Sequence, residues 1–384
     1  MIVSRLIVKN WRNFRHVDVA LRERQFLVGP NASGKSNLLD VLRFLRDITV
    51  TDGGGLQKAV KDRGGVTKVR CLTTRRDPEV AIEVHLAESA DDVVSWRYAI
   101  GITQGTRGRR QTRLAYERVW QGDRQVLDRP DAFDRNDPDR LTQTYLEQIN
   151  TNQDFRDIAQ FLRTVTYLHL VPQLLRFGDS IGGRVLESDP FGQAFLERLA
   201  TTPEKTTRSR LSKIENALRI AVPQLSQLQL VRDEITGRPH LQALYTHWRP
   251  KAGWQREDQF SDGTLRLIAL LWSLLDGNSP LLLEEPELSL NAGIVRQLAP
   301  LIYSMQRQRP RQILISTHSE ALLTESGIDG REVLVLTPGI EGTSVTVASD
   351  IAEVRALLEA GLTVGEVVLP RTAPEDVHML GAMR

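Results

Sequence analysis

The chain has 384 residues, of which 50 are basic and 48 are acidic, so its formal net charge is only +2. This balance is unlike that of a strongly basic nucleic-acid binder or of a protein with an acidic tail. Cys71 is the only cysteine, which excludes an internal disulfide framework and a cysteine zinc site. The chain start lacks the pattern of a signal peptide and no apolar run approaches about 18 residues, so we expect no membrane span and a cytoplasmic location.

The first elements lead into a glycine-rich turn. Residues 2–9 and 17–23 have alternating patterns that predict strands, and the apolar residues 26–28 predict a third strand. Residues 29–36, GPNASGKS, match G-x-x-x-x-G-K-[ST] without a mismatch, and apolar residues at helical spacing follow from Leu38. A strand before and a helix after are the context in which this motif binds phosphate, so a chance glycine turn explains it poorly.

The residue types in this turn suit a nucleoside triphosphate with Mg²⁺. Glycines let consecutive backbone N–H groups surround a phosphate at the positive end of the following helix. Lys35 supplies a mobile positive charge for the β- and γ-phosphates, and the Ser36 hydroxyl is a hard oxygen ligand for Mg²⁺. We therefore expect ATP to contact Asn31, Ser33, Gly34, Lys35, Ser36 and Asn37.

The middle of the chain alternates between strand and helix patterns. Residues 66–120 carry four runs that predict an antiparallel meander, at 66–74, 79–87, 93–102 and 113–120. Its hairpins bear four arginines, Arg107, Arg109, Arg110 and Arg113. The pattern then predicts a loop over 128–140, a helix over 141–164, a strand over 164–171 closed by Pro172 and Gln173, helices over 188–220, and a hairpin over 226–248.

Residues 260–264, FSDGT, precede a helical run that extends to residue 276. Ser261 is suited to cap that helix, and Gly263 lets another backbone approach closely. A helix start with free N–H groups and a serine is a second candidate anion site. Taken alone, a simple helix cap explains this stretch better.

Acidic residues follow a short apolar strand at residues 280–287, PLLLEEPE. A fully apolar strand is typical of the centre of a parallel sheet, and ligands bind at the carboxyl ends of such strands. Glu284 is placed to hold Mg²⁺, and Glu285 is placed to accept a proton from attacking water. The alternative is a pair of solvated acids after a strand, which the upstream phosphate motif disfavours.

A histidine follows the next apolar strand, in residues 312–319, QILISTHS. An imidazole at the end of a strand beside the acidic one can hydrogen-bond a γ-phosphate, so we expect His318 to act with Glu285 in catalysis. The alternative is an exposed or capping histidine.

These four stretches, in this order, resemble the ABC-type ATPase head of the RecF/SMC-like group. GPNASGKS resembles its Walker A loop, FSDGT its signature motif, PLLLEEPE its Walker B motif with the catalytic glutamate, and STHS its switch-histidine motif. The resemblance implies an α/β P-loop NTPase fold with a mixed central sheet, an antiparallel β-meander and a helical second lobe. It divides the chain into an ATPase lobe (1–173 and 276–370), a helical lobe (174–275) and a tail (371–384).

The same resemblance implies that ATP is bound between two heads in a homodimer, with Ser261 and Gly263 of one subunit facing Lys35 of the other. It also implies that Gln173 senses Mg²⁺ and the γ-phosphate. Three features depart from the group: Glu284 stands where Asp is usual, Asn291 stands where many short relatives have His, and no coiled-coil insertion, zinc hook or TOPRIM domain is evident.

Two functions fit this pattern. The first is a regulatory or DNA-sensing ATPase switch in a prokaryotic anti-phage defence module, with a nuclease-like partner effector. The second is a RecF-like DNA-repair ATPase that clamps duplex DNA, for which the arginines at 107–113 and the basic residues at 205–213 are candidate phosphate contacts. A transporter subunit is disfavoured by the long, strand-rich gap between Walker A and the signature, and by the lack of L-S-G-G-Q.

Overall fold

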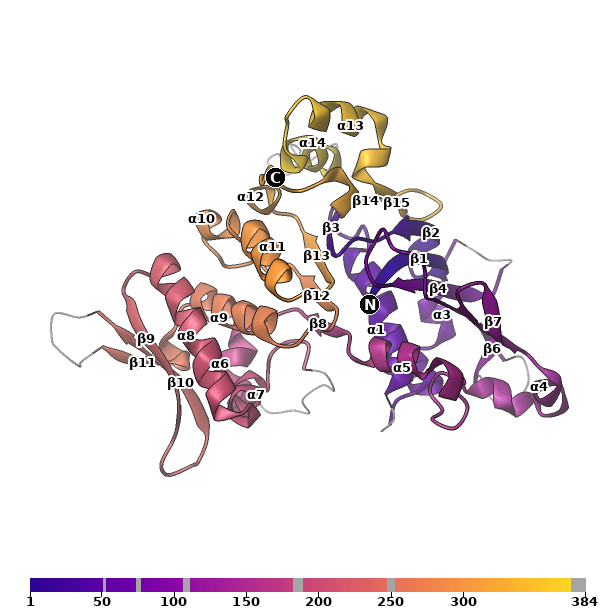
Figure 1. Cartoon of the computed structure of the whole chain (residues 1–384), viewed down its shortest axis with the longest axis horizontal. Coiled ribbons are helices and arrows are strands. Elements are labelled where there is room, and N and C mark those ends of the chain that lie inside the picture. Colours follow the sequence, from indigo (N-terminus) through magenta and orange to yellow (C-terminus); the bar gives the residue numbers. More distant parts are fainter. Residues whose placement is uncertain (51–52, 74–76, 106–110, 182–188, 247–252, 374–384) are drawn as a thin grey trace, which may run out of the picture.

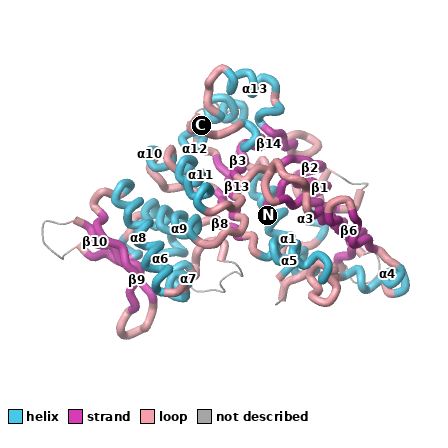
Figure 2. Tube along the Cα trace, in the orientation of Figure 1, coloured by secondary structure: helices cyan, strands magenta, loops and turns pink. Residues whose placement is uncertain are grey.

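A computed structural model describes residues 1–50, 53–73, 77–105, 111–181, 189–246 and 253–373. Three sheets organise these residues, which we call the central, outer and small sheets (Figures 1 and 2). In Figure 1 the central sheet lies between the outer sheet on the right and the small sheet with its helices on the left. The arginines at 107, 109 and 110 and residues 374–384 of the expected tail lie outside the described residues.

The central sheet has six strands in the order β15-β14-β3-β13-β12-β8, parallel except for β15. Its side chains alternate between two buried faces: Leu27, Leu282 and Leu314 join one core, and Phe26, Leu283 and Ile315 join the other. This explains the short, wholly apolar strands. Four predicted strands of this sheet are confirmed, with bounds β3 (Arg24–Val28), β8 (Thr166–Leu168), β12 (Leu281–Glu284) and β13 (Ile313–Thr317). The edge strands β14 (Val333–Thr337) and β15 (Ser344–Val347) were not predicted individually.

The outer sheet is antiparallel, in the order β2-β1-β4-β5-β6-β7. The predicted meander is thus confirmed in kind, but the strand predicted over 66–74 is wrong. Val66 and Val69 point to the core from one helical turn, and a spacing of three residues had resembled alternation. The bounds are β1 (Ile2–Trp11), β2 (Phe14–Ala20), α2 (Leu56–Lys61), α3 (Val66–Val69), β4 (Val80–Ala87), β5 (Trp96–Gln104), β6 (Thr112–Gln121) and β7 (Arg124–Arg129).

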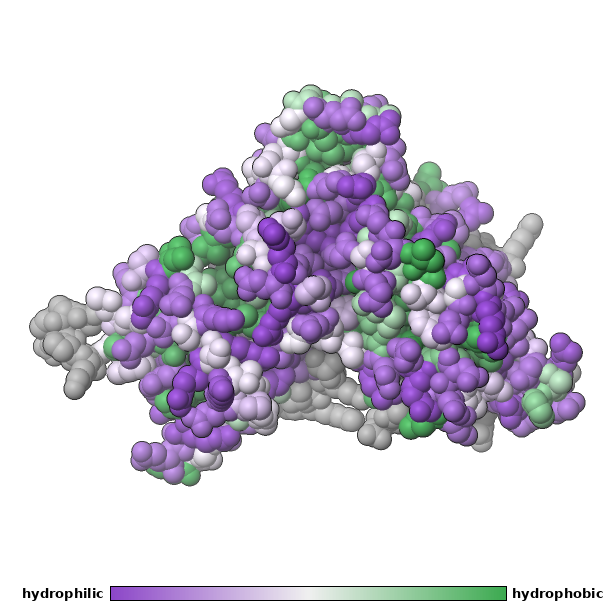
Figure 3. Space-filling model, viewed as in Figure 1, coloured by the Kyte–Doolittle hydropathy of each residue, from purple (hydrophilic) through white to green (hydrophobic). Residues whose placement is uncertain are grey.

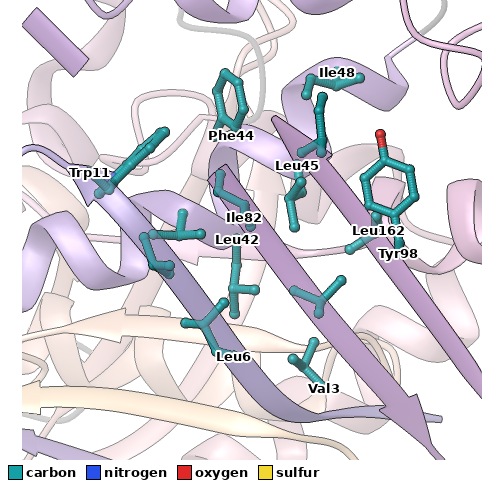
Figure 4. Close-up of a cluster of buried hydrophobic side chains, with 14 of the residues drawn as sticks. Val3, Leu6, Trp11, Leu42, Phe44, Leu45, Ile48, Ile82, Tyr98 and Leu162 are labelled. Carbon is teal, nitrogen blue, oxygen red and sulfur yellow. The ribbon is translucent and has the colours of Figure 1, made fainter. Parts of the chain in front are cut away.

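Helix α1 (Lys35–Thr49) fills the space between the outer and central sheets. Figure 4 shows its side chains Leu42, Phe44, Leu45 and Ile48 among side chains of the outer sheet. The ring of Phe44 lies 5.1 Å from that of Trp11, between centroids. This apolar packing fixes the helix whose first turn carries the phosphate motif.

Residues 128–163 differ most from the predicted pattern. The predicted loop contains α4 (Ala132–Asn136), whose start Asp131 caps, and the predicted helix over 141–164 forms only as α5 (Arg156–Arg163). The buried Glu117 carboxylate accepts the backbone N–H groups of Tyr145 and Leu146, so these amides do not enter a helix.

The second lobe combines helices with the small sheet, β11-β10-β9. The predicted helices and hairpin are confirmed, while the third strand, β11, was not predicted. Phe195 packs edge-on against Trp272, with ring centroids 6.5 Å apart. The bounds are α6 (Pro172–Ile181), α7 (Phe195–Thr201), α8 (Glu204–Ala221), β9 (Leu225–Arg232), β10 (Pro239–Tyr245), β11 (Trp254–Arg256) and α9 (Asp262–Leu275). The lobe boundaries themselves stay a prediction.

Short helices complete the described chain. The face in Figure 3 is largely hydrophilic, with apolar side chains in separate groups. Within the described ranges no helix is long and apolar enough to cross a bilayer. The remaining α-helices are α10 (Ala292–Val295), α11 (Leu298–Gln308), α12 (Glu320–Leu323), α13 (Ala352–Glu359) and α14 (Val364–Val368), and 3₁₀ turns span Pro138–Thr142, Gln153–Phe155, Glu257–Gln259, Gly330–Glu332, Ala348–Asp350 and Leu369–Thr372.

Candidate active site

The glycine-rich turn between β3 and α1 is held by Asn13, a residue that the sequence pattern did not single out. Asn13 Nδ2 donates to the carbonyl oxygen of Ser33 at 2.8 Å, and Asn37 Nδ2 donates to Asn13 Oδ1 at 2.8 Å. Gly34 has φ 98°, and a Cβ added there would lie 2.1 Å from Asn13 Nδ2. The turn therefore requires glycine at position 34, both for its conformation and for space.

Polar groups in the turn have capacity for an anionic ligand. Within the described part of the chain, Lys35 Nζ donates only to carbonyl oxygens of the turn itself, to Gly29 at 3.0 Å and Pro30 at 3.1 Å. Burial lowers the pKa of Lys35, and the nearby Glu285 and Glu284 carboxylates oppose that shift. The Ser33 hydroxyl is buried and has no hydrogen-bond partner among the described residues. These features fit a phosphate group.

The first metal candidates, Ser36 and Glu284, are in direct contact. Ser36 Oγ donates to Glu284 Oε1, and the Tyr167 hydroxyl donates to Glu284 Oε2. Among the described residues no group of three or more His, Cys, Asp or Glu side chains could hold a metal. One hydroxyl and one carboxylate beside a phosphate loop nevertheless suit Mg²⁺, which takes few protein oxygens and completes its shell with water and phosphate.

Glu285 and His318 are also brought together, with His318 Nε2 3.4 Å from Glu285 Oε1. The backbone of Glu285 has φ 44°, an unusual value for a residue with a side chain. Its N–H donates to Ser316 O at 3.0 Å, and its carbonyl accepts from Arg266 Nη1 at 3.3 Å. Backbone strain held from two sides is typical of a functional position.

Glu287 is a further residue at this edge that the sequence pattern did not single out. Its Oε1 accepts from Thr317 Oγ1 at 2.5 Å and from the His318 N–H at 3.4 Å. Burial raises the pKa of Glu287, while the Thr317 hydrogen bond opposes the rise. Glu287 thus connects the chain after β12 to the end of β13. An acid two residues beyond Glu285 was its only signal in the sequence.

Ser261 and Gly263 lie at the start of α9. Ser261 is exposed and caps α9, accepting from the Thr264 N–H at 3.1 Å. A Cβ added at Gly263 would lie 2.5 Å from the carbonyl oxygen of Ser289, so the two loops touch through their backbones. No hydrogen bond in the described part of the chain joins Ser261 to the turn that contains Lys35.

Gln173 lies beside the start of α9. Its Nε2 donates to Asp262 Oδ2 at 3.1 Å, and Arg176 donates to Asp262 Oδ1 at 2.7 Å. No hydrogen bond among the described residues joins Gln173 to Ser36 or Glu284, and its metal-sensing role stays a prediction.

A hollow of about 460 Å³ adjoins the glycine-rich turn. Asn13 and Asn37, which hold the turn, form part of its wall, and Leu72 and Ile340 expose apolar side chains there. Apolar surface with convergent polar groups is typical of small-molecule sites. The other lining residues are Arg12, Thr67, Lys68, Arg70, Cys71, Thr73, Gly339, Gly342 and Thr343.

One curated relative matches part of the chain. The DNA replication and repair protein RecF of Proteus mirabilis is 30% identical over 115 residues, which are 30% of this chain and 28% of that protein. The chain therefore matches less than a third of the length of this curated relative.

Solved structures show the same fold. An Smc head bound to the C-terminal winged-helix domain of ScpA superposes with a TM-score of 0.55 at 12% identity, over 90% of this chain and 98% of that one. The Smc head with an extended coiled coil from Pyrococcus furiosus gives 0.50 at 14% identity, over 94% and 99%.

The family described as "AAA domain, putative AbiEii toxin, Type IV TA system" matches residues 26–324, which contain all four motifs. Because this match spans well over half of the chain, the protein, which has the fold of an Smc head, belongs to this AAA-domain family.

Proposed function

We propose that this protein binds ATP with Mg²⁺ and hydrolyses it. The observation that carries the proposal is the contact between Ser36 and Glu284, next to Lys35 and at the carboxyl ends of parallel strands. Phosphoryl transfer requires mainly positioning and neutralisation of charge, which these groups can supply.

Each residue has a separate task in this reaction. Lys35 and the N–H groups of the turn bind the phosphates, while Ser36 and Glu284 hold Mg²⁺, which neutralises phosphate charge when bound. Glu285 orients a water molecule and accepts its proton. His318, whose pKa burial lowers, is neutral at neutral pH and donates a hydrogen bond to the γ-phosphate. Asn13 and Asn37 direct the nucleoside into the adjoining hollow.

Glu285→Gln tests the hydrolytic step. The amide cannot accept the proton, so we expect turnover to fall by roughly 10²–10⁴ while ATP still binds. Phosphate release gives the rate, and calorimetry with ATP gives the affinity. Unchanged turnover would exclude Glu285 as the base, and a wild-type protein that binds no ATP would overturn the proposal as a whole.

We further propose that two copies bind ATP between them. Support comes from Ser261, which is exposed at the start of a 14-residue helix and has no bond to the Lys35 turn of its own chain within the described residues. A nucleotide that bridges two subunits stabilises their dimer by mass action. Size-exclusion chromatography of Glu285→Gln with and without ATP tests this, because the dimer should form only with ATP.

The biological role that we favour is a regulatory switch in a prokaryotic defence module, acting with a nuclease-like effector. The family description, which names a toxin of a type IV toxin–antitoxin system, supports this role. Co-purification with the product of a neighbouring gene, dependent on ATP, is the expected result. A protein that remains without a partner in its native host would count against it.

The similarity to RecF favours a second candidate, an ATPase that clamps duplex DNA. Three described basic residues proposed for this role have acidic neighbours: Arg113 pairs with Asp139, Arg208 with Glu204, and Arg210 with Asp276. Binding through phosphates should weaken steeply as salt increases. Absent or salt-insensitive DNA binding in the presence of ATP would exclude this candidate.

A further inference from the structure

The carboxylate of Glu284 is held from two sides, and the second contact comes from a residue with no assigned role. Tyr167 lies on β8, directly beside β12, where it pairs with Leu282. Tyr167 is buried, at 6% exposure, and its hydroxyl donates to Oε2 of Glu284, the last residue of β12. Ser36 donates to the other oxygen, Oε1. Each carboxylate oxygen therefore has its own hydroxyl donor.

The Tyr167 ring is itself fixed by α1, the helix that begins with Lys35. The guanidinium carbon of Arg43 lies 4.0 Å from the centroid of the Tyr167 ring. Arg43 lies 3.7 Å from Asp40, and Asp40 is paired with Arg63 at 2.8 Å. Because Arg63 and Asp40 are both nearly buried, this row of contacts limits how far the tyrosine can move.

A positioned hydroxyl matters here because residue 284 is glutamate. Glutamate has one more methylene and one more rotatable bond than aspartate, so its carboxylate samples more positions unless something restrains it. A hydrogen bond to one oxygen restrains the rotation and directs the other oxygen toward Ser36.

We propose that Tyr167 is a positioning residue that holds the Glu284 carboxylate against Ser36 and thereby adapts a glutamate to the Mg²⁺ site. This inference rests on the proposed ATP function. It states that Tyr167 acts through Glu284 and touches neither nucleotide nor metal.

The test is the Mg²⁺ dependence of nucleotide binding, measured with adenylyl imidodiphosphate so that no hydrolysis is involved. In Tyr167→Phe only the hydroxyl is lost. A hydrogen bond to a charged group contributes enough that we expect roughly tenfold more Mg²⁺ to be needed for half-maximal binding. Affinity measured in EDTA, without Mg²⁺, should equal that of the wild type.

Tyr98→Phe is the matched control, because the buried Tyr98 hydroxyl also donates to a carboxylate, that of Glu117, at 3.1 Å in the outer sheet. It should leave both affinities unchanged. Glu284→Asp supplies the second arm. Its side chain is shorter by one bond, about 1.5 Å, so we expect its carboxylate to lose the Tyr167 contact. Adding Tyr167→Phe to Glu284→Asp should therefore have no further effect.

Three results would overturn the proposal: an unchanged Mg²⁺ requirement in Tyr167→Phe, an equal shift in Tyr98→Phe, or effects of Tyr167→Phe and Glu284→Asp that simply add. A loss of affinity in EDTA would also overturn it, since it would show a general structural role. A wild-type protein that binds no nucleotide would overturn the proposed function together with this inference, so the two failures are distinguishable.

Discussion

The state of the His318 ring follows from its neighbours. Burial lowers its pKa, the positive charge of Lys35 lowers it further, and Glu285 opposes the shift. The ring is therefore neutral at neutral pH, with one nitrogen that donates and one that accepts. A neutral donor suits a site in which Lys35 already supplies positive charge.

This lowered pKa makes stability depend on pH in a definite direction. As pH falls below about 6.5, the unfolded chain takes up a proton before the folded chain does, so the free energy of unfolding decreases. We expect His318→Gln to make this decrease smaller, as measured by urea unfolding between about pH 7.5 and 5. His16→Gln, at an exposed position, is the control for replacing a histidine as such. A wild-type slope in His318→Gln would contradict the shift.

At the scale of single residues, spacing along the chain was enough to predict some contacts of the site but not others. Ser36 meets Glu284 because one follows the phosphate loop and the other ends a parallel strand, and both features are visible in the sequence. Asn13, Tyr167 and Glu287 act through contacts with residues distant in the chain. Nothing in the sequence around Asn13 or Tyr167 distinguishes them from ordinary turn and strand residues, and Glu287 had only its proximity to Glu285 as a signal.

Among the elements, α1 depends on a charge cluster as well as on apolar packing. Asp40, on its second turn, contacts Arg63 at 2.8 Å and Arg12 at 2.8 Å, and lies 3.7 Å from Arg43. Burial alone would raise the pKa of Asp40, but these arginines hold it below its usual value. The cluster joins α1 to the β1–β2 turn and to the chain after α2.

Asp40→Asn should destabilise the protein by about 3 kcal/mol, because it leaves nearly buried guanidinium groups without their counter-charge. The carboxylate's contribution is present above about pH 3.8 and is lost as pH falls below that value, so the difference from wild type should shrink in acid. Asp62→Asn is the control, since its pair with Lys58 is exposed and should contribute less than about 1 kcal/mol. Urea unfolding at neutral and acid pH measures both. Equal stability of Asp40→Asn and wild type would refute this role.

In one mispredicted region the backbone is organised by a side chain that is distant in the sequence. Residues 144–152 lie within the predicted helix, yet the Glu117 carboxylate accepts two of their backbone N–H groups and Asn152 donates to the Leu146 carbonyl. These competing hydrogen bonds replace the helical ladder. Local periodicity cannot reveal partners that are about thirty residues away in the chain.

For the whole molecule, the order of motifs was enough to predict the class of fold. Strands ending in GPNASGKS, Glu284 and Ser316–His318 had to lie in one parallel sheet if their ligands were to meet, and the order β3-β13-β12 meets that condition. The outer sheet packs against α1 by burying apolar side chains on it. This arrangement could not be predicted from the order of motifs.

A dimer with two shared sites predicts a specific mixing result. Lys35→Ala removes the positive charge that binds the phosphates, and Ser261→Arg blocks the surface offered to the other subunit. Each variant alone should therefore be inactive. A mixed dimer of the two retains one intact site, which with random exchange should restore roughly a quarter of wild-type hydrolysis. Phosphate release from the mixture is the measurement. No recovery, with both variants folded and exchanging, would contradict sites shared across subunits.

The backbone contact between Gly263 and Ser289 has a consequence for how such a pair would work. A carbonyl oxygen lies where even one methyl group could not fit, so neither loop can move toward the other without displacing it. In the proposed dimer, Ser261 contacts the nucleotide bound by the other subunit. Glu285, four residues before Ser289, acts on the nucleotide bound by its own subunit. Hydrolysis at one of the two shared sites could then move the loop that contacts the nucleotide at the other site, which would couple the two sites.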